Sequence, residues 1–196
     1  APLALELAVW GVRDPHDLHW LDLPPPAAYA QARELLTRLQ ALDAAGKVSA
    51  HGKRMHRLGV HPRLAHMLLC ASQEGYGAMA CDLAALLSAR DGLRAGTAAP
   101  EDMRERLQML SGGEAGTGAD RDEVRRVRAE SVRLARLMAG ITAADAPGSA
   151  SVAPASSAPH SPHSPAIAAD ACGRLLAYAY PDRIAQNRGD GRVVLA

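Results

Sequence analysis

Four histidines recur at every fifth position of the segment HGKRMHRLGVHPRLAH, namely His51, His56, His61 and His66. Imidazole is the commonest metal ligand among side chains, so the spacing raises the question of a metal site. Five residues turn a helix by about 140° net, and an odd step changes faces in a strand, so no single regular element gathers all four. A loop could bend two of them onto one ion, but we expect surface and boundary histidines and no metal site.

Sequence signatures of catalysis are missing. A phosphate-binding loop needs Gly-x-x-x-x-Gly-Lys followed by Ser or Thr. Gly46-Lys47 fails this pattern twice, because Val48 follows and Ala41 occupies the position of the first glycine. The chain also lacks an Asp-Glu-Ala-His tetrad for magnesium and the Gly-x-Ser-x-Gly turn of serine hydrolases. We therefore predict no catalytic residue and no cofactor within this chain.

The composition indicates a helical protein of the reducing cytosol. Hydrophobic residues make up 48% of the 196 residues, but aromatic residues only 3%, and Phe is absent. A core of Leu, Ala, Val and Met suits packed helices better than sheets. Three cysteines without a Cys-x-x-Cys pair argue against a disulfide framework. No apolar run is long enough to span a bilayer and no signal-peptide pattern is present, so we expect no membrane partner and a cytoplasmic location.

Apolar periodicity and capping signals predict a succession of helices. Lys47-Val48-Ser49 reads as a short strand or wing edge, and Ser49 is a candidate cap for the helix that follows it. The helices are expected near residues 3–10, 14–17, 27–42, 49–58, 62–75, 76–89, 100–111, 120–139 and 166–178.

The last third of the chain changes character. Residues 142–165 are rich in Ala, Pro and Ser and contain no Lys or Arg, which predicts a flexible linker. Near the end, Gly189-Asp190-Gly191 predicts a turn and Val193-Val194-Leu195 a strand. The sequence shows no partner for that strand.

Three stretches in this order resemble one family. They are residues 3–55, residues 57–69 (RLGVHPRLAHMLL) and residues 177–196, which begin AYAYPDRIAQ. Together they resemble the region downstream of the motor domains in DEAH-box RNA helicases, and most of all the bacterial HrpB-type ATP-dependent helicases. The sequence departs from the family pattern at Gly59-Val60, where Pro-Leu is common, and at Val193, where an aromatic residue is common.

The resemblance implies a mainly α fold with several parts. Residues 1–60 would form a small winged-helix domain, in which Trp10 and Trp20 anchor the core rather than stack on bases. Residues 61–141 would form a helical, ratchet-like bundle, separated by the linker 142–165 from its last helix, 166–179. Residues 180–196 would be the truncated start of a β-rich region.

The resemblance also implies a role in RNA unwinding. The parent protein would be an ATP-dependent RNA helicase whose motor domains bind ATP and magnesium, whereas this chain lacks those domains and should be inactive alone. Its partners would be single-stranded RNA and the RecA-like motor domains of the same protein, and its bundle would form part of the RNA channel. Candidate contacts to the phosphates are Lys53, Arg54, Arg57, Arg63, Arg121, Arg125 and Arg128.

Other interpretations stay open at this point. Arginines 121, 125 and 128 alternate with acidic residues, so they could simply form ion pairs on a helix surface. The chain could instead be a free-standing winged-helix nucleic-acid-binding or adaptor protein. The basic residues of helix 27–42 are only Arg33 and Arg38, and Glu34 offsets one of them. This positive charge is small for a helix that binds in a DNA groove. A purely structural helical scaffold is the third possibility.

Overall fold

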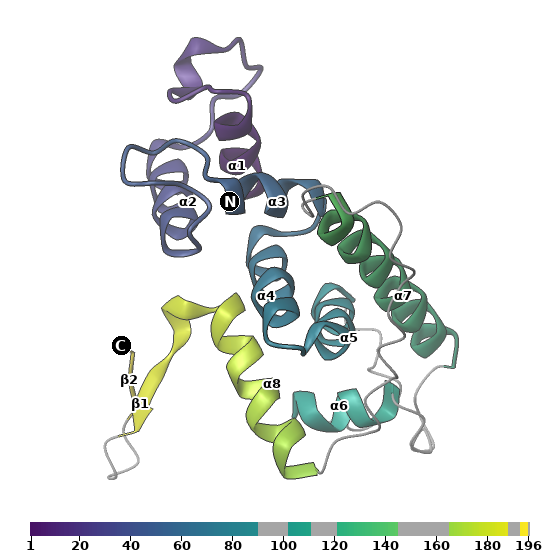
Figure 1. The fold of residues 1–196 in the computed structure, drawn as a ribbon. Coiled ribbons are helices and arrows are strands. Elements are labelled where there is room, and N and C mark those ends of the chain that lie inside the picture. Colours follow the sequence, from purple (N-terminus) through teal and green to yellow (C-terminus); the bar gives the residue numbers. More distant parts are fainter. Residues whose placement is uncertain (90–101, 111–120, 145–164, 188–192, 196) are drawn as a thin grey trace. The chain divides into compact units, whose positions relative to one another are not determined.

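The computed structural model describes residues 1–89, 102–110, 121–144, 165–187 and 193–195. The described chain is mainly helical, which confirms the predicted fold class at this level (Figure 1). The helices are α1 Pro2–Val9, α2 Pro26–Arg38, α3 Ala50–Arg57, α4 Pro62–Gln73, α5 Gly77–Ser88, α6 Met103–Leu110, α7 Arg121–Ala144 and α8 Pro165–Ala179. Two short 3₁₀ helices lie at Pro15–Asp17 and Pro181–Arg183.

The chain forms two compact units, one of residues 1–70 with 176–196 and one of residues 71–175. The predicted domain boundaries after residues 60, 141, 165 and 179 are not tested by this division into units and remain a prediction. Within the described residues, no helix is both long and apolar enough to cross a membrane.

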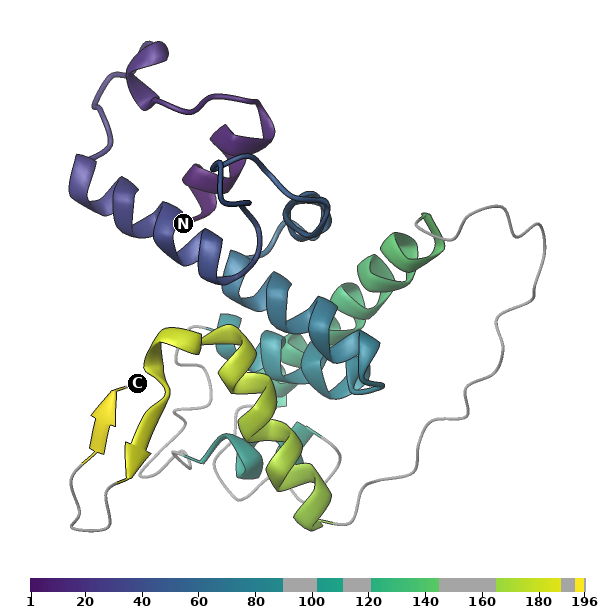
Figure 2. The ribbon, with the colours of Figure 1, turned by 60° about the vertical axis from the view of Figure 1, so that its left-hand side comes forward.

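In the first unit, α1 packs against both α2 and α3 (Figure 2). Proline at the first helical position starts α1 and α2. The predicted cap of α3 is confirmed, because the Ser49 hydroxyl accepts a hydrogen bond from the Gly52 amide at 2.9 Å. The apolar side chains buried here include Leu7, Leu36, Leu39, Met55 and Leu58.

Helix α2 ends at Arg38, four residues before the predicted end. Gln40 adopts a positive φ of 57°, which takes the chain out of the helix. The chain then reverses, and Leu42 pairs with Val48 in an isolated antiparallel bridge. The Asp43 carboxylate holds this turn by accepting from the amides of Ala45 and Lys47 at 2.9 and 2.8 Å.

Trp10 does not anchor a core, so that prediction was wrong. It caps the C-terminus of α1 and is 66% exposed. Trp20 is half-buried, and its indole nitrogen donates to the carbonyl oxygen of Pro15 at 2.7 Å.

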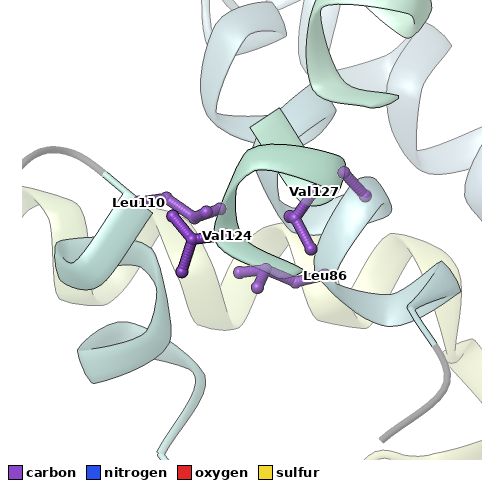
Figure 3. Packing of buried hydrophobic residues seen from close by; sticks show 5 residues of the cluster. Leu86, Leu110, Val124 and Val127 are labelled. Carbon is purple, nitrogen blue, oxygen red and sulfur yellow. The ribbon is translucent and has the colours of Figure 1, made fainter. Parts of the chain in front are cut away.

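In the second unit, α5 packs against α6 and α7. The inward residues of α7 recur at alternating steps of three and four, which is the stripe of an amphipathic helix. Figure 3 shows how Leu86, Leu110, Val124 and Val127 meet between the three helices. The buried positions of α7 are Val124, Val127, Ser131, Leu134, Met138 and Ile141.

Several predicted boundaries of this unit cannot be compared with the structure. The predicted helix boundaries at residues 100, 111 and 120 lie outside the described residues. The same holds for residues 145–164 of the predicted linker, whereas residues 142–144 belong to α7.

The C-terminal residues contain a small strand pair. β1, Ala185–Asn187, runs antiparallel to β2, Val193–Leu195, with Ala185 opposite Leu195. The predicted strand 193–195 thus has a partner that the sequence did not reveal. A larger β-rich region remains a prediction.

Candidate functional site

The segment from Ser49 to Gln73 carries the first group of candidate cations on α3 and the first turn of α4. Met55 and Leu58 face the core of the first unit, which turns the opposite face of α3 outward. Lys53 and Arg57 are exposed on that outer face, and Arg54 is half-buried. The surface formed by Lys53, Arg54 and Arg57 is called the α3 basic face below.

Arg63 is engaged by the C-terminal end of α8 rather than by solvent. Its two terminal nitrogens donate to the Asp182 carboxylate at 2.5 and 2.7 Å, and one of them also donates to the Ala179 carbonyl oxygen at 3.1 Å. The guanidinium also lies over the Tyr180 ring, 5.2 Å from its centre. The Arg63 side chain is only 13% exposed.

This pair joins two of the three stretches on which the family resemblance rests. His61-Pro62-Arg63 begins α4, and Tyr180-Pro181-Asp182 follows α8, 119 residues further along the chain. The hydrogen bonds from Arg63 hold the pKa of Asp182 at about 2, well below its ordinary value. The same bonds raise the pKa of Arg63.

The second group of candidate cations lies on α7, in the other compact unit. Arg121 and Arg125 are exposed, and Arg125 forms an ion pair with Asp122 at 3.2 Å. Arg128 donates twice to the Leu110 carbonyl oxygen, at 3.1 and 2.8 Å, and so satisfies a backbone group at the C-terminal end of α6. The ion-pairing interpretation therefore has a structural basis for Arg125, whereas Arg128 contacts a backbone carbonyl oxygen instead of an acidic side chain.

The four evenly spaced histidines have three different surroundings. His51 and His66 meet, with Nε2 of His51 2.8 Å from Nδ1 of His66. His56 pairs with Glu6 at 2.7 Å, and exposed His61 precedes α4. Thus the structure brings two of the four together, through the packing of two helices rather than through a loop.

A cysteine that the sequence analysis did not single out lies beside this pair. The Cys70 sulfur is 3.6 Å from Nε2 of His66. His66 and Cys70 are four residues apart on α4, and this spacing on one helix face was the signal that could have found them.

Burial keeps both rings of the histidine pair neutral. It is the main cause that lowers the pKa of His51 to about 4, with nearby His66 and Arg54 adding to the shift. Burial also lowers the pKa of His66. At neutral pH the two imidazoles therefore share one hydrogen bond, in which one nitrogen donates and the other accepts.

A cavity of about 470 Å³ lies beside the Arg63–Asp182 pair. It is lined among others by Glu34, Arg38 and His61. Both of its guanidinium groups already face carboxylates, Arg38 that of Glu34 at 2.8 Å and Arg63 that of Asp182. This balance of charge gives no reason to assign an anionic ligand to the cavity.

Comparisons with known proteins agree with the sequence resemblance. Over 85 residues the chain is 42% identical to the ATP-dependent RNA helicase HrpB of Escherichia coli K12, a match that covers 43% of this chain and 10% of that protein. Two crystal structures of Escherichia coli HrpB, described as a DExH-box NTPase and as a DEAH/RHA helicase, match with 28% identity and a TM-score of 0.64. Each match covers 99% of this chain and 19% or 20% of the longer one.

These matches confirm the resemblance to HrpB-type helicases. The chain spans a tenth to a fifth of the length of the proteins that it resembles. No protein-family model matches the sequence.

Proposed function

We propose that this chain is the helicase-associated portion of an HrpB-like ATP-dependent RNA helicase, and that it forms part of the wall of a single-stranded RNA channel. The observation that carries the proposal is the match to HrpB over 99% of the chain. In this proposal residues 1–60 contribute a winged-helix-like domain, α4 to α8 contribute the ratchet-like bundle, and the C-terminal strand pair begins a β-rich region.

The motor chemistry would reside elsewhere in the parent protein. The sequence has neither a phosphate-binding loop nor an Asp-Glu-Ala-His tetrad, so ATP and magnesium would bind to RecA-like motor domains of the same protein. Those domains and RNA are the proposed partners, and the bacterial cytoplasm is the proposed location. The chain would position RNA and would not hydrolyse ATP by itself.

The α3 basic face is the part of the described surface best suited to RNA. A channel wall contacts phosphates without regard to sequence, and exposed Lys and Arg side chains are the groups that do so. Lys53 and Arg57 project from a helix whose other face is anchored by Met55. Arg63 is less suited to this role, because Asp182 and Ala179 already occupy its donors.

The free-standing winged-helix alternative receives less support from α2. Of the two arginines available to a recognition helix, Arg33 donates to the carbonyl oxygen of Gly46 at 3.3 Å. Arg38 forms an ion pair with Glu34 within the same helix. A recognition helix needs side chains that can leave the protein surface and reach base edges.

Binding of the 196-residue chain to a fluorescently labelled single-stranded oligouridine, compared with a DNA duplex of the same length, tests the proposal. Fluorescence anisotropy at two salt concentrations should show binding to the RNA that weakens as salt rises. Preference for the duplex would favour the winged-helix alternative. Absence of binding to either nucleic acid would favour a purely structural scaffold.

A further inference from the structure

Three potential metal ligands converge between α3 and α4. One ligand atom from each of His51, His66 and Cys70 can be chosen so that all lie within 4.8 Å of one another. Nε2 of His51 and Nδ1 of His66 are 2.8 Å apart, and the cysteine sulfur is 3.9 Å from the same Nδ1 and 3.6 Å from Nε2 of that ring. A search of the described residues for three or more His, Cys, Asp or Glu side chains with ligand atoms this close together finds these three residues.

The backbone brings these groups together before any ion is bound. His66 and Cys70 are one turn apart on α4, so their side chains leave the same face of that helix. His51 comes from the first turn of α3, which the Ser49 cap and the contact of Gly52 with Ala41 hold in place. The Tyr178 ring stands edge-on to the His66 ring at 6.2 Å and limits its movement.

The three side chains differ in their exposure to solvent, which bears on how an ion could reach them. His66 is 8% exposed, whereas His51 and Cys70 are half-buried. The cluster is therefore embedded in the protein and still open to an ion from solvent on one side. Carboxylate ligands are missing from it, so it does not suit calcium or magnesium, which prefer oxygen.

We propose that His51, His66 and Cys70 form a zinc site with two imidazole nitrogens and one thiolate as ligands. Zinc accepts this mixed set in tetrahedral geometry, with a water molecule as the fourth ligand. At ordinary zinc distances, neighbouring ligand atoms lie about 3.3–3.7 Å apart. The facing nitrogens of His51 and His66 would thus need to separate by about half an ångström, which small side-chain rotations supply.

Binding would exchange one set of interactions for another. The hydrogen bond between the rings of His51 and His66 is lost, and each ring gives a nitrogen lone pair to the metal. The Cys70 thiol loses its proton to solvent, and its sulfur binds as thiolate. The ion would then link α3 to α4 and stabilise the first unit, because the unfolded chain does not hold these ligands together.

Titration of the reduced, untagged and chelator-treated 196-residue chain with zinc chloride tests the site. Calorimetry should show one zinc ion per chain, and the melting temperature should rise with zinc. Cobalt(II) in place of zinc should produce a thiolate-to-cobalt charge-transfer band and the strong visible bands of tetrahedral cobalt. These spectral features report the ligand set directly and do not depend on RNA binding.

Two variants and a matched control identify the ligands. C70A and H51Q should each weaken zinc binding by at least about tenfold, the scale already seen when an outer-shell partner is lost. C70A should abolish the charge-transfer band. The control changes His160 and His163 of the Pro-His-Ser-Pro-His-Ser-Pro segment to Gln, and should leave zinc binding unchanged.

The melting temperature of each metal-free variant shows whether it folds. Alanine favours a helix, so α4 should tolerate C70A. Three results would each overturn the proposal: no zinc binding by the wild-type chain, equal binding by folded C70A, or loss of binding in the His160 and His163 control.

Discussion

At the scale of single residues, the arginines show that a basic residue predicted to contact RNA can serve the fold instead of a ligand. Arg63 has its donors occupied by Asp182 and the Ala179 carbonyl oxygen, and Arg128 has two bonds to the Leu110 carbonyl oxygen. Lys53 projects from α3 at an exposed position. Charge alone did not separate these roles in the sequence, because the partners are distant in the chain.

Replacing Asp182 by Ala should destabilise the first unit. The change leaves a guanidinium that is only 13% exposed without its carboxylate and removes two charge-assisted hydrogen bonds. We expect the free energy of unfolding to fall by about 1–3 kcal/mol. Urea denaturation followed by circular dichroism measures this change.

Glu34→Ala is the matched control for that experiment. It also removes a carboxylate from an arginine, but both side chains of the Glu34–Arg38 pair are more than half exposed. Such a pair should contribute no more than about 0.5 kcal/mol. Equal effects of the two substitutions would contradict a structural role for the Arg63–Asp182 pair.

The same pair predicts how stability depends on pH. Folding lowers the pKa of Asp182 from its ordinary value of 3.8 to about 2. A lowered pKa in the folded state means that the stabilisation is present above the ordinary value and is lost as the pH falls through about 2.

Comparison of the wild type with Asp182→Asn at several pH values measures this dependence. The difference in unfolding free energy should be constant at neutral pH and shrink below about pH 4. A difference that stays constant down to about pH 2 would show that the ionised carboxylate is not what stabilises the pair.

At the scale of elements, local sequence signals predicted where helices begin. They did not predict the end of α2 or the pairing of the C-terminal strand, because both depend on contacts with other parts of the chain. Ser49 and Pro62 start helices where the sequence suggested, because caps and first-turn prolines act within one turn, and α2 begins at Pro26, one residue before its predicted start. The early end of α2 depends on the left-handed Gln40 and the reversal after it. The partner of strand 193–195 had no periodic signal, since three residues are too few to show one.

In the candidate site, too, features set by nearby residues were predictable and features set by distant contacts were not. The spacing of apolar residues along α3 indicated its outward face, and the spacing of charges along α7 indicated the pairing of its arginines with nearby acidic residues. The meeting of His51 with His66 was not, because it depends on how two helices pack. The bond from Arg63 to Asp182 spans 119 residues and has no local signature.

Gly52→Ala should disrupt the packing of α3 against the turn after α2. An added Cβ would lie 2.2 Å from the Ala41 carbonyl oxygen and 3.0 Å from a methyl of Val48. The oxygen belongs to the backbone and cannot rotate away, so we expect a loss of about 1–3 kcal/mol in the free energy of unfolding.

Gly140→Ala in α7 makes the same chemical change but should raise stability, whereas Gly52→Ala should lower it. No atom lies within 4 Å of a Cβ added there. Alanine should therefore stabilise α7 by about 0.5–1 kcal/mol through its higher helix propensity. If chemical denaturation found that both substitutions stabilise the protein, the close contact at Gly52 would be ruled out.

Truncation of Leu134 should test the packing of α7. Leu134 is fully buried, and its change to Ala removes apolar contacts and leaves a cavity, at a cost of about 2–5 kcal/mol. Val132→Ala on the same helix should change stability by less than about 0.5 kcal/mol, since Val132 is 50% exposed. Thermal unfolding of the two variants would show similar melting temperatures if α7 were not packed through this face.

At the scale of the whole molecule, the net charge of +1 means that any attraction to RNA must be local. Each phosphate contact to single-stranded nucleic acid contributes about 0.7 to the slope of log affinity against log salt concentration. The proposed function therefore predicts that Lys53→Ala weakens oligouridine binding and makes this slope shallower by about 0.7. Anisotropy titrations at four or more salt concentrations would measure the slope.

Lys47→Ala separates a specific surface from overall charge. Lys47 is exposed on the turn between Leu42 and Val48, and its loss changes the net charge by the same amount as the loss of Lys53. If the α3 basic face contacts the phosphates, K47A should keep the wild-type slope. A slope reduced equally by K53A and K47A would indicate diffuse attraction. A reduction by K47A alone would place the RNA at this turn rather than on the α3 basic face.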